Sequence, residues 1–241
     1  MSLLVITSTV YVNSNLTVLI DPDIRLKQYI DSIKFYAGSP FINRIIICDN
    51  SGFDYSENIE IQYIAKIKEI ECLHFVGNKT EILKKGKGYG EGEIMEYVIN
   101  NSKLMSEEEN SFYKVTGRIL LYNVNSIIKA MKKDVNYFQQ VGINPFRKVQ
   151  AVDTRFYHCN KATFFKYLKN AYHQVNDLAT FYLEHAYYNS LKSNSVPFKN
   201  FVEQPNFGGI SGSTGNSYAI KKPQLLLLRT AYKALRILHL I

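Results

Sequence analysis

Apolar and polar residues follow strand and helix periods in turn through the first half of the chain. Apolar runs predict strands at 3–12, 44–52 and 70–78. Apolar residues three to four positions apart predict helices at 23–38 and 90–105. This order predicts an α/β fold with a mostly parallel central sheet flanked by helices. The stripe of the first helix consists of Ile24, Leu26, Tyr29, Ile30 and Ile33.

The segment 111–120, "SFYKVTGRIL", alternates with the period of a pleated strand. Its predicted apolar face consists of Tyr113, Val115 and Ile119. Its predicted polar face consists of Lys114, Thr116 and Arg118. A central strand of a parallel sheet is normally covered on both faces, so cations there favour a functional site over a solvated surface.

The second half is less regular. We expect a helix and then a strand over 124–140, and a strand and then a helix over 151–175, with Asn160 as the cap. A strongly periodic helix is predicted over 177–193, with Glu184 at the margin of its apolar stripe. That stripe consists of Leu178, Phe181, Tyr182, His185 and Tyr188.

Near the end of the chain, the sequence predicts a mobile loop followed by a basic helix. The loop at 203–223 is rich in Gly, Ser and Asn, and we expect part of it to close over a ligand. An amphipathic helix follows at 221–241, so we expect one domain over 1–220 with this helix appended. The helix fits either a membrane surface or a packing partner. Its basic face consists of Lys222, Arg229, Lys233 and Arg236.

Composition narrows the class of partner. The formal charge of +8 and the pI near 9.2 favour anionic partners, namely nucleotides, phospholipid headgroups or nucleic acid. Three widely spaced cysteines argue against a disulfide framework and against a zinc site. No run of 18 apolar residues and no basic leader is present, so we expect a cytoplasmic protein, peripheral on the inner face of the membrane if the last helix binds there.

Candidate binding residues lie where strands end, because open α/β sheets bind ligands beyond the carboxyl ends of their strands. These residues are Thr7, Ser8, Thr9, Asp49 and Asn50. The glycine cluster "GKGYGEGE" at 86–93 lacks the dinucleotide and Walker spacings. It fits equally a flexible basic loop and a phosphate or sugar contact. The residues concerned are Lys85, Lys87, Tyr89 and Glu91.

Together these segments resemble a GT-A type glycosyltransferase, of the bacterial capsule or O-antigen kind that carries a Lys-x-Thr-Gly-Arg strand. The resemblance runs from Leu3 to about Tyr218. It implies hexosyl transfer from a nucleotide-diphosphate sugar, with UDP as the expected nucleotide, to a saccharide acceptor that is lipid-linked. It places the nucleotide against 7–9 and 49–50, and the diphosphate beside Lys87, Tyr89 and Glu91.

One departure from that family concerns the metal. The family's Asp-x-Asp motif is missing from the strand at 111–120, and "DPD" at 21–23 is instead expected to start a helix. Lys114 and Arg118, with Thr116, would then neutralise the diphosphate directly. We therefore assign no metal ligand, although Mn²⁺ or Mg²⁺ remains an open alternative.

For catalysis the resemblance implies a carboxylate that accepts the proton of the acceptor hydroxyl. Glu184 is the first candidate and Asp153 the second, while Arg155 and His185 are expected to bind the acceptor. Asp153 has an alternative role as the ion-pair partner of Arg155, and Glu184 as a solvated helix charge. This hypothesis involves no nucleic acid. The competing hypothesis is a non-catalytic basic protein that binds nucleic acid or an anionic membrane.

Overall fold

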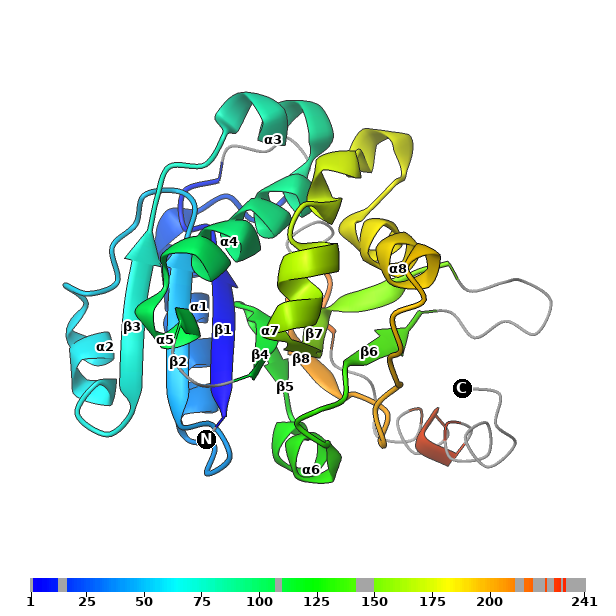
Figure 1. The fold of residues 1–241 in the computed structure, drawn as a ribbon. Helices are drawn as coiled ribbons and strands as arrows, with labels where there is room; N and C mark the ends of the chain where they lie inside the picture. Colours follow the sequence, from blue (N-terminus) through cyan, green and yellow to red (C-terminus); the bar gives the residue numbers. More distant parts are fainter. Residues whose placement is uncertain are drawn as a thin grey trace.

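In a computed structural model, the chain folds around a six-stranded sheet with the order β3-β2-β1-β4-β7-β6 (Figure 1). The structure describes residues 2–12, 17–106, 110–141, 150–210, 215–218, 224, 228–230 and 232. The strands of the sheet are β1 (Leu3–Ser8), β2 (Arg44–Asp49), β3 (Glu69–His74), β4 (Ser111–Thr116), β6 (Tyr137–Gln140) and β7 (Val152–Asn160).

The sheet is parallel over β3, β2, β1 and β4. Strand β7 runs antiparallel to both β4 and β6. The first residues of β7 therefore lie at the edge where the parallel strands end. A second, two-stranded sheet pairs β5 (Ile119–Leu121) with β8 (Phe207–Gly209).

Helices cover both faces of the large sheet (Figure 1). Alternate β1 side chains enter two separate cores: Leu4 and Ile6 in one, Leu3 and Val5 in the other. The first core is closed by α1 (Pro22–Ala37), α2 (Ile59–Ile64) and α6 (Val124–Ala130). The second is closed by α4 (Lys87–Asn101), α5 (Lys103–Ser106) and α8 (Leu183–Ser193), with α7 (Lys161–Thr163), η1 (Phe164–Leu168) and η2 (Ala171–Gln174) beside them. Helix α3 (Lys79–Lys85) leads from β3 toward α4.

The predicted α/β class and most predicted elements are confirmed. Every strand predicted in the first half is present, and the polar-ended run at 44–52 is strand β2 followed by a turn. The predicted helix start at "DPD" is also confirmed, because the Asp21 side chain accepts hydrogen bonds from the backbone N–H groups of Asp23 and Ile24. Within α1, however, Ile24 is exposed and its neighbour Arg25 is buried.

Two predicted elements have different bounds. The glycine cluster is not a loop, because α4 already begins at Lys87. The predicted helix 177–193 is divided into a 3₁₀ turn, η3 (Asp177–Ala179), and the shorter α8. Thr180 separates them with a left-handed φ of 59°, which no regular helix continues through. Leu178 is consequently 63% exposed, and Glu184 lies in the first turn of α8 and not in mid-helix.

Strand β4 is shorter than predicted, which changes the position of Arg118. Gly117 turns the chain out of the sheet while its N–H donates to the Thr7 carbonyl of β1. A Cβ at Gly117 would lie 2.3 Å from that carbonyl oxygen, so a side chain is excluded there. Lys114 and Thr116 share one face of β4 as predicted, but Arg118 lies beyond the strand, so the predicted three-residue face is wrong.

The predicted basic helix 221–241 lies largely outside the described residues, as do 211–214 of the predicted closing loop. Of the described residues near the end, Tyr232 is buried and its hydroxyl donates to Gln139 and to the Phe201 carbonyl. Among the helices that the structure describes, none is both long and apolar enough to cross a membrane.

Candidate active site

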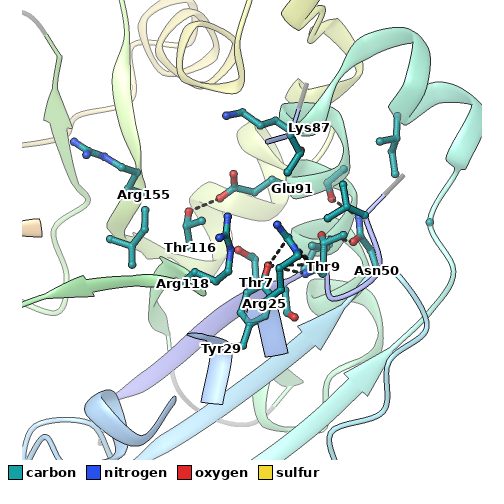
Figure 2. Close-up of a pocket in the computed structure, with 18 of the residues that line it drawn as sticks. Thr7, Thr9, Arg25, Tyr29, Asn50, Lys87, Glu91, Thr116, Arg118 and Arg155 are labelled. Carbon is teal, nitrogen blue, oxygen red and sulfur yellow. Dashed lines mark hydrogen bonds between the residues drawn. The ribbon is translucent and has the colours of Figure 1, made fainter. Parts of the chain in front are cut away.

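A cavity of about 240 Å³ opens at the carboxyl ends of β1, β2 and β4 (Figure 2). Its walls come from the ends of these strands, from α1, α3 and α4, and from the start of β7. It contains many of the predicted donor-binding residues. Those that line it are Thr7, Ser8, Thr9, Asn50, Lys87, Glu91, Thr116 and Arg118.

Asp49 organises the loops beside this cavity from a fully buried position. Its Oδ1 accepts hydrogen bonds from the N–H and hydroxyl of Ser51 and from the N–H of Phe53. Its Oδ2 accepts from the Ser8 hydroxyl at 2.7 Å and from the Val10 N–H at 3.0 Å. Asp49 lines neither cavity described here, so its position favours a structural role over the predicted contact with the nucleotide.

Arg25 fixes the loop that leaves β1. Its guanidinium donates to the carbonyls of Thr9 and Leu19 and to the hydroxyl of Tyr29. The Tyr29 hydroxyl in turn accepts from the N–H of Thr9 at 3.0 Å. Burial and the nearby Arg118 lower the pKa of Arg25. The backbone around Thr9 is therefore held by α1 before any ligand binds.

Beneath the cavity, Lys114 joins three elements. Its ammonium contacts the Glu91 carboxylate of α4, donates to the Thr116 hydroxyl at 3.0 Å, and donates to the Thr154 carbonyl of β7 at 2.7 Å. The Thr116 hydroxyl also donates to Glu91 at 2.8 Å (Figure 2). Lys114 is only 1% exposed, so it supports the floor and cannot contact a bound diphosphate as predicted.

The buried position also changes the acidity of Lys114. Burial lowers its pKa to about 7, against the opposing attraction of Glu184 and Asp153. A charged ammonium with little access to water depends on its carboxylate partner. Glu91 is that partner, and the contact accounts for the presence of an acid on a helix that faces a basic cavity.

Basic side chains from separate elements surround the same cavity. Figure 2 shows Lys87 and Arg155 above Arg118 and Arg25, which lie side by side in the view, and all four line the cavity. Arg118 donates to Gln28, an uncharged partner, so its positive charge is retained near the cavity. Such a ring of cations suits a ligand with clustered negative charge. The basic residues that line the cavity are Arg25, Lys79, Lys87, Arg118 and Arg155.

A second cavity, of about 810 Å³, adjoins the first and shares part of its wall. Glu184 lines both, and its Oε1 accepts a hydrogen bond from the Thr154 hydroxyl at 3.0 Å. Because Thr154 also receives Lys114 on its carbonyl, Glu184 is linked to the floor of the first cavity. The residues that line both cavities are Thr17, Lys87, Glu91, Arg155, Glu184 and Tyr218.

Asp153 forms an ion pair with Arg155, which was its alternative predicted role. The guanidinium donates to both carboxylate oxygens, at 3.0 Å to Oδ1 and 2.6 Å to Oδ2, and it lies 4.1 Å from the centroid of the Phe207 ring. This pairing raises the pKa of Arg155 against the opposing effect of burial. Glu184, which accepts the Thr154 hydroxyl and is not engaged by a bidentate guanidinium, is the better placed of the two carboxylates to accept a proton.

Lys85 and Tyr89 lie away from both cavities, whereas His185, expected to bind the acceptor, lines the second. Tyr89 is buried on the far side of α4 against Tyr172 and lines neither cavity, so its predicted donor contact is not supported by its position. Lys85 donates to the His173 carbonyl, outside the site. His185 lines only the second cavity, where its Nδ1 accepts the Tyr182 N–H.

The structure also adds residues that the sequence analysis missed. Arg25 follows Ile24 in a predicted apolar stripe, and only its i,i+4 spacing to Tyr29 indicated the buried face. Lys79 and Asp177 reach the cavities from segments with no motif. Thr154 lay between two candidates, Asp153 and Arg155, and its hydroxyl is the one that contacts Glu184.

The side chains at the end of β4 do not fit the metal site that the GT-A resemblance implies. Lys114 and Thr116 occupy the strand, and the neighbouring carboxylate of Glu91 is already paired with that lysine. In the part of the chain that the structure describes, no group of three or more His, Cys, Asp or Glu side chains is arranged to hold a metal ion.

Solved structures that share this fold include two transferases. The glycosyltransferase GlyE from Streptococcus pneumoniae TIGR4 superimposes with a TM-score of 0.50 at 8% identity, over 83% of this chain and 44% of GlyE. This chain therefore spans less than half the length of GlyE. A protein from Desulfovibrio desulfuricans G20, assigned as a nucleotide-diphospho-sugar transferase, gives a TM-score of 0.50 at 9% identity, over 83% and 80% of the two chains. The sequence matches no protein-family profile and no curated protein. At such low identity the likeness shows a shared fold alone.

Proposed function

We propose that this chain is a glycosyltransferase that moves a sugar from a nucleotide diphosphate, with UDP as the expected nucleotide, to a saccharide acceptor. One observation carries the proposal. A cavity at the carboxyl ends of parallel strands is ringed by basic side chains and is separated by Glu184 from a second cavity. Two adjoining sites of this kind suit a charged donor and an acceptor that must meet.

The first cavity would bind the donor. The strand ends at Thr7 to Thr9 and Asn50 offer hydroxyl, amide and backbone groups to a nucleoside. Lys79, Lys87 and Arg118 would neutralise the diphosphate, and the guanidinium is suited to bidentate phosphate contact. Preorganised cations that face the leaving group are effective because they need no rearrangement as charge develops. Lys114 would act indirectly, by holding Glu91 and Thr154 in place.

Glu184 would act as the general base of an inverting transfer. The acceptor oxygen forms a bond to the anomeric carbon as the bond from that carbon to the diphosphate oxygen breaks. The diphosphate leaves with the bonding electrons, and Glu184 takes the hydroxyl proton. Asp153 is the weaker candidate, because Arg155 already donates to both of its oxygens.

Isothermal titration with UDP tests the donor site, with added Mn²⁺ and separately with EDTA. We expect binding in both conditions, because the basic side chains that line the cavity would neutralise the diphosphate without a metal. Absence of binding in both conditions would reject the nucleotide-sugar proposal. Binding that disappears with EDTA would assign charge neutralisation to a metal and remove that role from the cations.

Arg118→Ala tests the cationic ring. We expect UDP affinity to fall roughly tenfold, the effect of losing one charge-assisted phosphate contact. Lys129→Ala on α6 is a matched control, because it removes a cation that lines neither cavity. Unchanged UDP affinity and turnover in Arg118→Ala would end the proposed role of this residue.

A lipid-linked acceptor in surface polysaccharide synthesis is a finer proposal, supported by the basic pattern at 221–241. Co-sedimentation with vesicles tests it. We expect binding to vesicles that contain phosphatidylglycerol, little binding to pure phosphatidylcholine, and loss of binding when 221–241 is deleted. Equal binding of the deleted chain would remove the membrane role of this segment.

A further inference from the structure

The two adjoining cavities have opposite charge. Glu91 pairs with Lys114 and Asp153 pairs with Arg155, so these charges largely cancel and are left out of the comparison. The remaining charged side chains of the first cavity are one acid, Glu184, and four bases, Arg25, Lys79, Lys87 and Arg118. The second is lined by two acids, Asp177 and Glu184, and by one basic side chain, Lys87, which attracts Asp177. A site for a phosphate-bearing group would be expected to have the first composition and not the second.

Asp177 is the acid that distinguishes the second cavity. It is 8% exposed, and its Oδ2 accepts the N–H of Gly88 in the first turn of α4 at 3.0 Å. Its Oδ1 is buried and accepts no hydrogen bond from the residues that the structure describes. A buried carboxylate oxygen without a donor leaves negative charge at the wall of the second cavity.

The glycines of α4 make this position possible. A Cβ at Gly86 would lie 2.4 Å from the Asp177 side chain, and one at Gly88 would lie 3.0 Å from its Oδ1. Gly86 also has a φ of +102°, which side chains other than glycine rarely adopt. The helix start is therefore shaped around a carboxylate, which accounts for two of the glycines that otherwise match no phosphate-binding motif.

The rest of the second cavity suits a sugar ring. Tyr182 is 40% exposed there, and its ring stacks with the imidazole of His185 at 5.5 Å. Since His185 Nδ1 accepts a backbone N–H, the neutral ring carries its proton on Nε2, which is a donor for a hydroxyl. Aromatic faces with adjacent hydrogen-bonding groups match the alternating apolar and polar surface of a pyranose.

We infer that the second cavity binds the acceptor as a sugar ring without an acidic group, and that Asp177 is a specificity-determining residue whose charge repels carboxylate-bearing sugars. Only the identification of this sugar as the acceptor rests on the proposed function. The preference for a neutral over an acidic sugar does not depend on it. Like charges brought together in a poorly solvated site are costly, so an acidic sugar should bind markedly less well than its neutral counterpart.

Matched glycosides test the inference. The probes are p-nitrophenyl glucoside and galactoside with their glucuronide and galacturonide counterparts, which differ only by a carboxylate for a hydroxymethyl group. Binding is measured by saturation-transfer NMR titration, with and without UDP. We expect at least one neutral glycoside to bind roughly tenfold more tightly than its uronide.

Asp177→Asn tests the contribution of Asp177 to this preference separately from that of the other residues of the cavity. Asn retains an oxygen for the Gly88 N–H and replaces the second acceptor with a donor, so we expect the preference to fall below about threefold. Asp31→Asn, on the exposed face of α1, is the matched control and should retain the full preference. If Asp177→Asn unfolds, the comparison of neutral and acidic glycosides on the unmodified protein still decides the inference.

The outcomes distinguish this inference from the proposed function. Uronides that bind as well as neutral glycosides, glycosides that all fail to bind, or a preference unchanged in Asp177→Asn would overturn it. Absence of UDP binding, together with an intact glycoside preference, would reject the donor proposal and leave the inference standing.

Discussion

The two sides of the candidate site use their buried polar groups differently. On the β1–β2 side, Asp49 and Arg25 are engaged by loop backbone and neighbouring hydroxyls. On the β4–β7 side, Lys114, Glu91 and Glu184 form a charged network that continues to the walls of both cavities. The first side holds a binding surface in shape, whereas the second supplies charges that can respond to a ligand.

This difference indicates where substitutions should separate binding, stability and turnover. Loss of a group on the β1–β2 side should loosen loops and weaken donor binding. Loss of a group on the β4–β7 side should change charge at the reacting atoms or leave an ion without its partner.

Glu184→Gln should have the largest effect. If Glu184 is the base, kcat should fall by about 10² to 10⁴, because the amide cannot accept the hydroxyl proton. UDP affinity and thermal stability should change little, since the Thr154 hydroxyl can still donate to the amide oxygen. Steady-state kinetics with a UDP-sugar, UDP titration and thermal unfolding measure the three quantities.

Glu57→Gln, an exposed substitution before α2, controls for loss of a carboxylate elsewhere. If Glu184→Gln retained more than half of the kcat while Asp153→Asn lost most of it, the assignment of the base would move to Asp153.

Glu91→Gln should destabilise the fold. At pH 6, below the pKa of Lys114, it leaves the buried ammonium without its contacting carboxylate, which costs about 3 kcal/mol in comparable buried pairs. Urea unfolding measures this change in the free energy of unfolding. The double variant Lys114→Met with Glu91→Gln removes both charges and should regain more than half of the loss. A single variant as stable as the unmodified protein would show that the pair is unimportant to the floor.

Asp49→Asn tests the β1–β2 side. The NH₂ group of Asn would face a backbone N–H that now donates to the Asp49 carboxylate, and two donors cannot pair. We therefore expect the unfolding free energy to fall by about 2 kcal/mol. The donor KM should rise while kcat changes less, because the loops lose their order and the base is untouched. Asp31→Asn again serves as control. A loss of UDP affinity without any loss of stability would instead favour the direct nucleotide contact predicted from the sequence.

His158 gives the smallest effect, and only in acid. It lies on β7, its Nδ1 donates to the Val135 carbonyl at 2.9 Å, and its buried Nε2 has no partner among the described residues. Burial lowers its pKa to about 4, so between pH 6.5 and 4 the unfolded chain binds the proton more strongly than the folded one. Stability should therefore fall as pH decreases through this window, by about 1.4 kcal/mol at pH 5.5.

His158→Gln retains a donor for the carbonyl and cannot titrate. Urea unfolding at pH 7.5 and at pH 5.5 should show a smaller loss for this variant than for the unmodified protein. Equal losses would mean that His158 does not contribute to acid sensitivity.

Much of the architecture followed from local pattern. Apolar runs and helical stripes placed β1, α1, β2 and β3 correctly, because buried strands and amphipathic helices impose their periods on the sequence. Because open α/β sheets bind ligands beyond the carboxyl ends of their strands, the sequence also predicted the strand ends that line the first cavity. These features depend on neighbours that are close in sequence, or on the common edge of parallel strands.

Local residue pattern was therefore sufficient to predict the α/β fold and the edge of the sheet at which the candidate site lies. The tertiary structure alone decided what each charge contacts. Lys114 and Arg118 look equivalent in "KVTGR", yet the close approach of Gly117 to β1 sends one under the floor and the other to the wall. Asp177 and Glu91 likewise acquire their surroundings from segments distant in the chain. Charge interactions depend on distance and burial, and neither is encoded by the spacing of residues along the sequence.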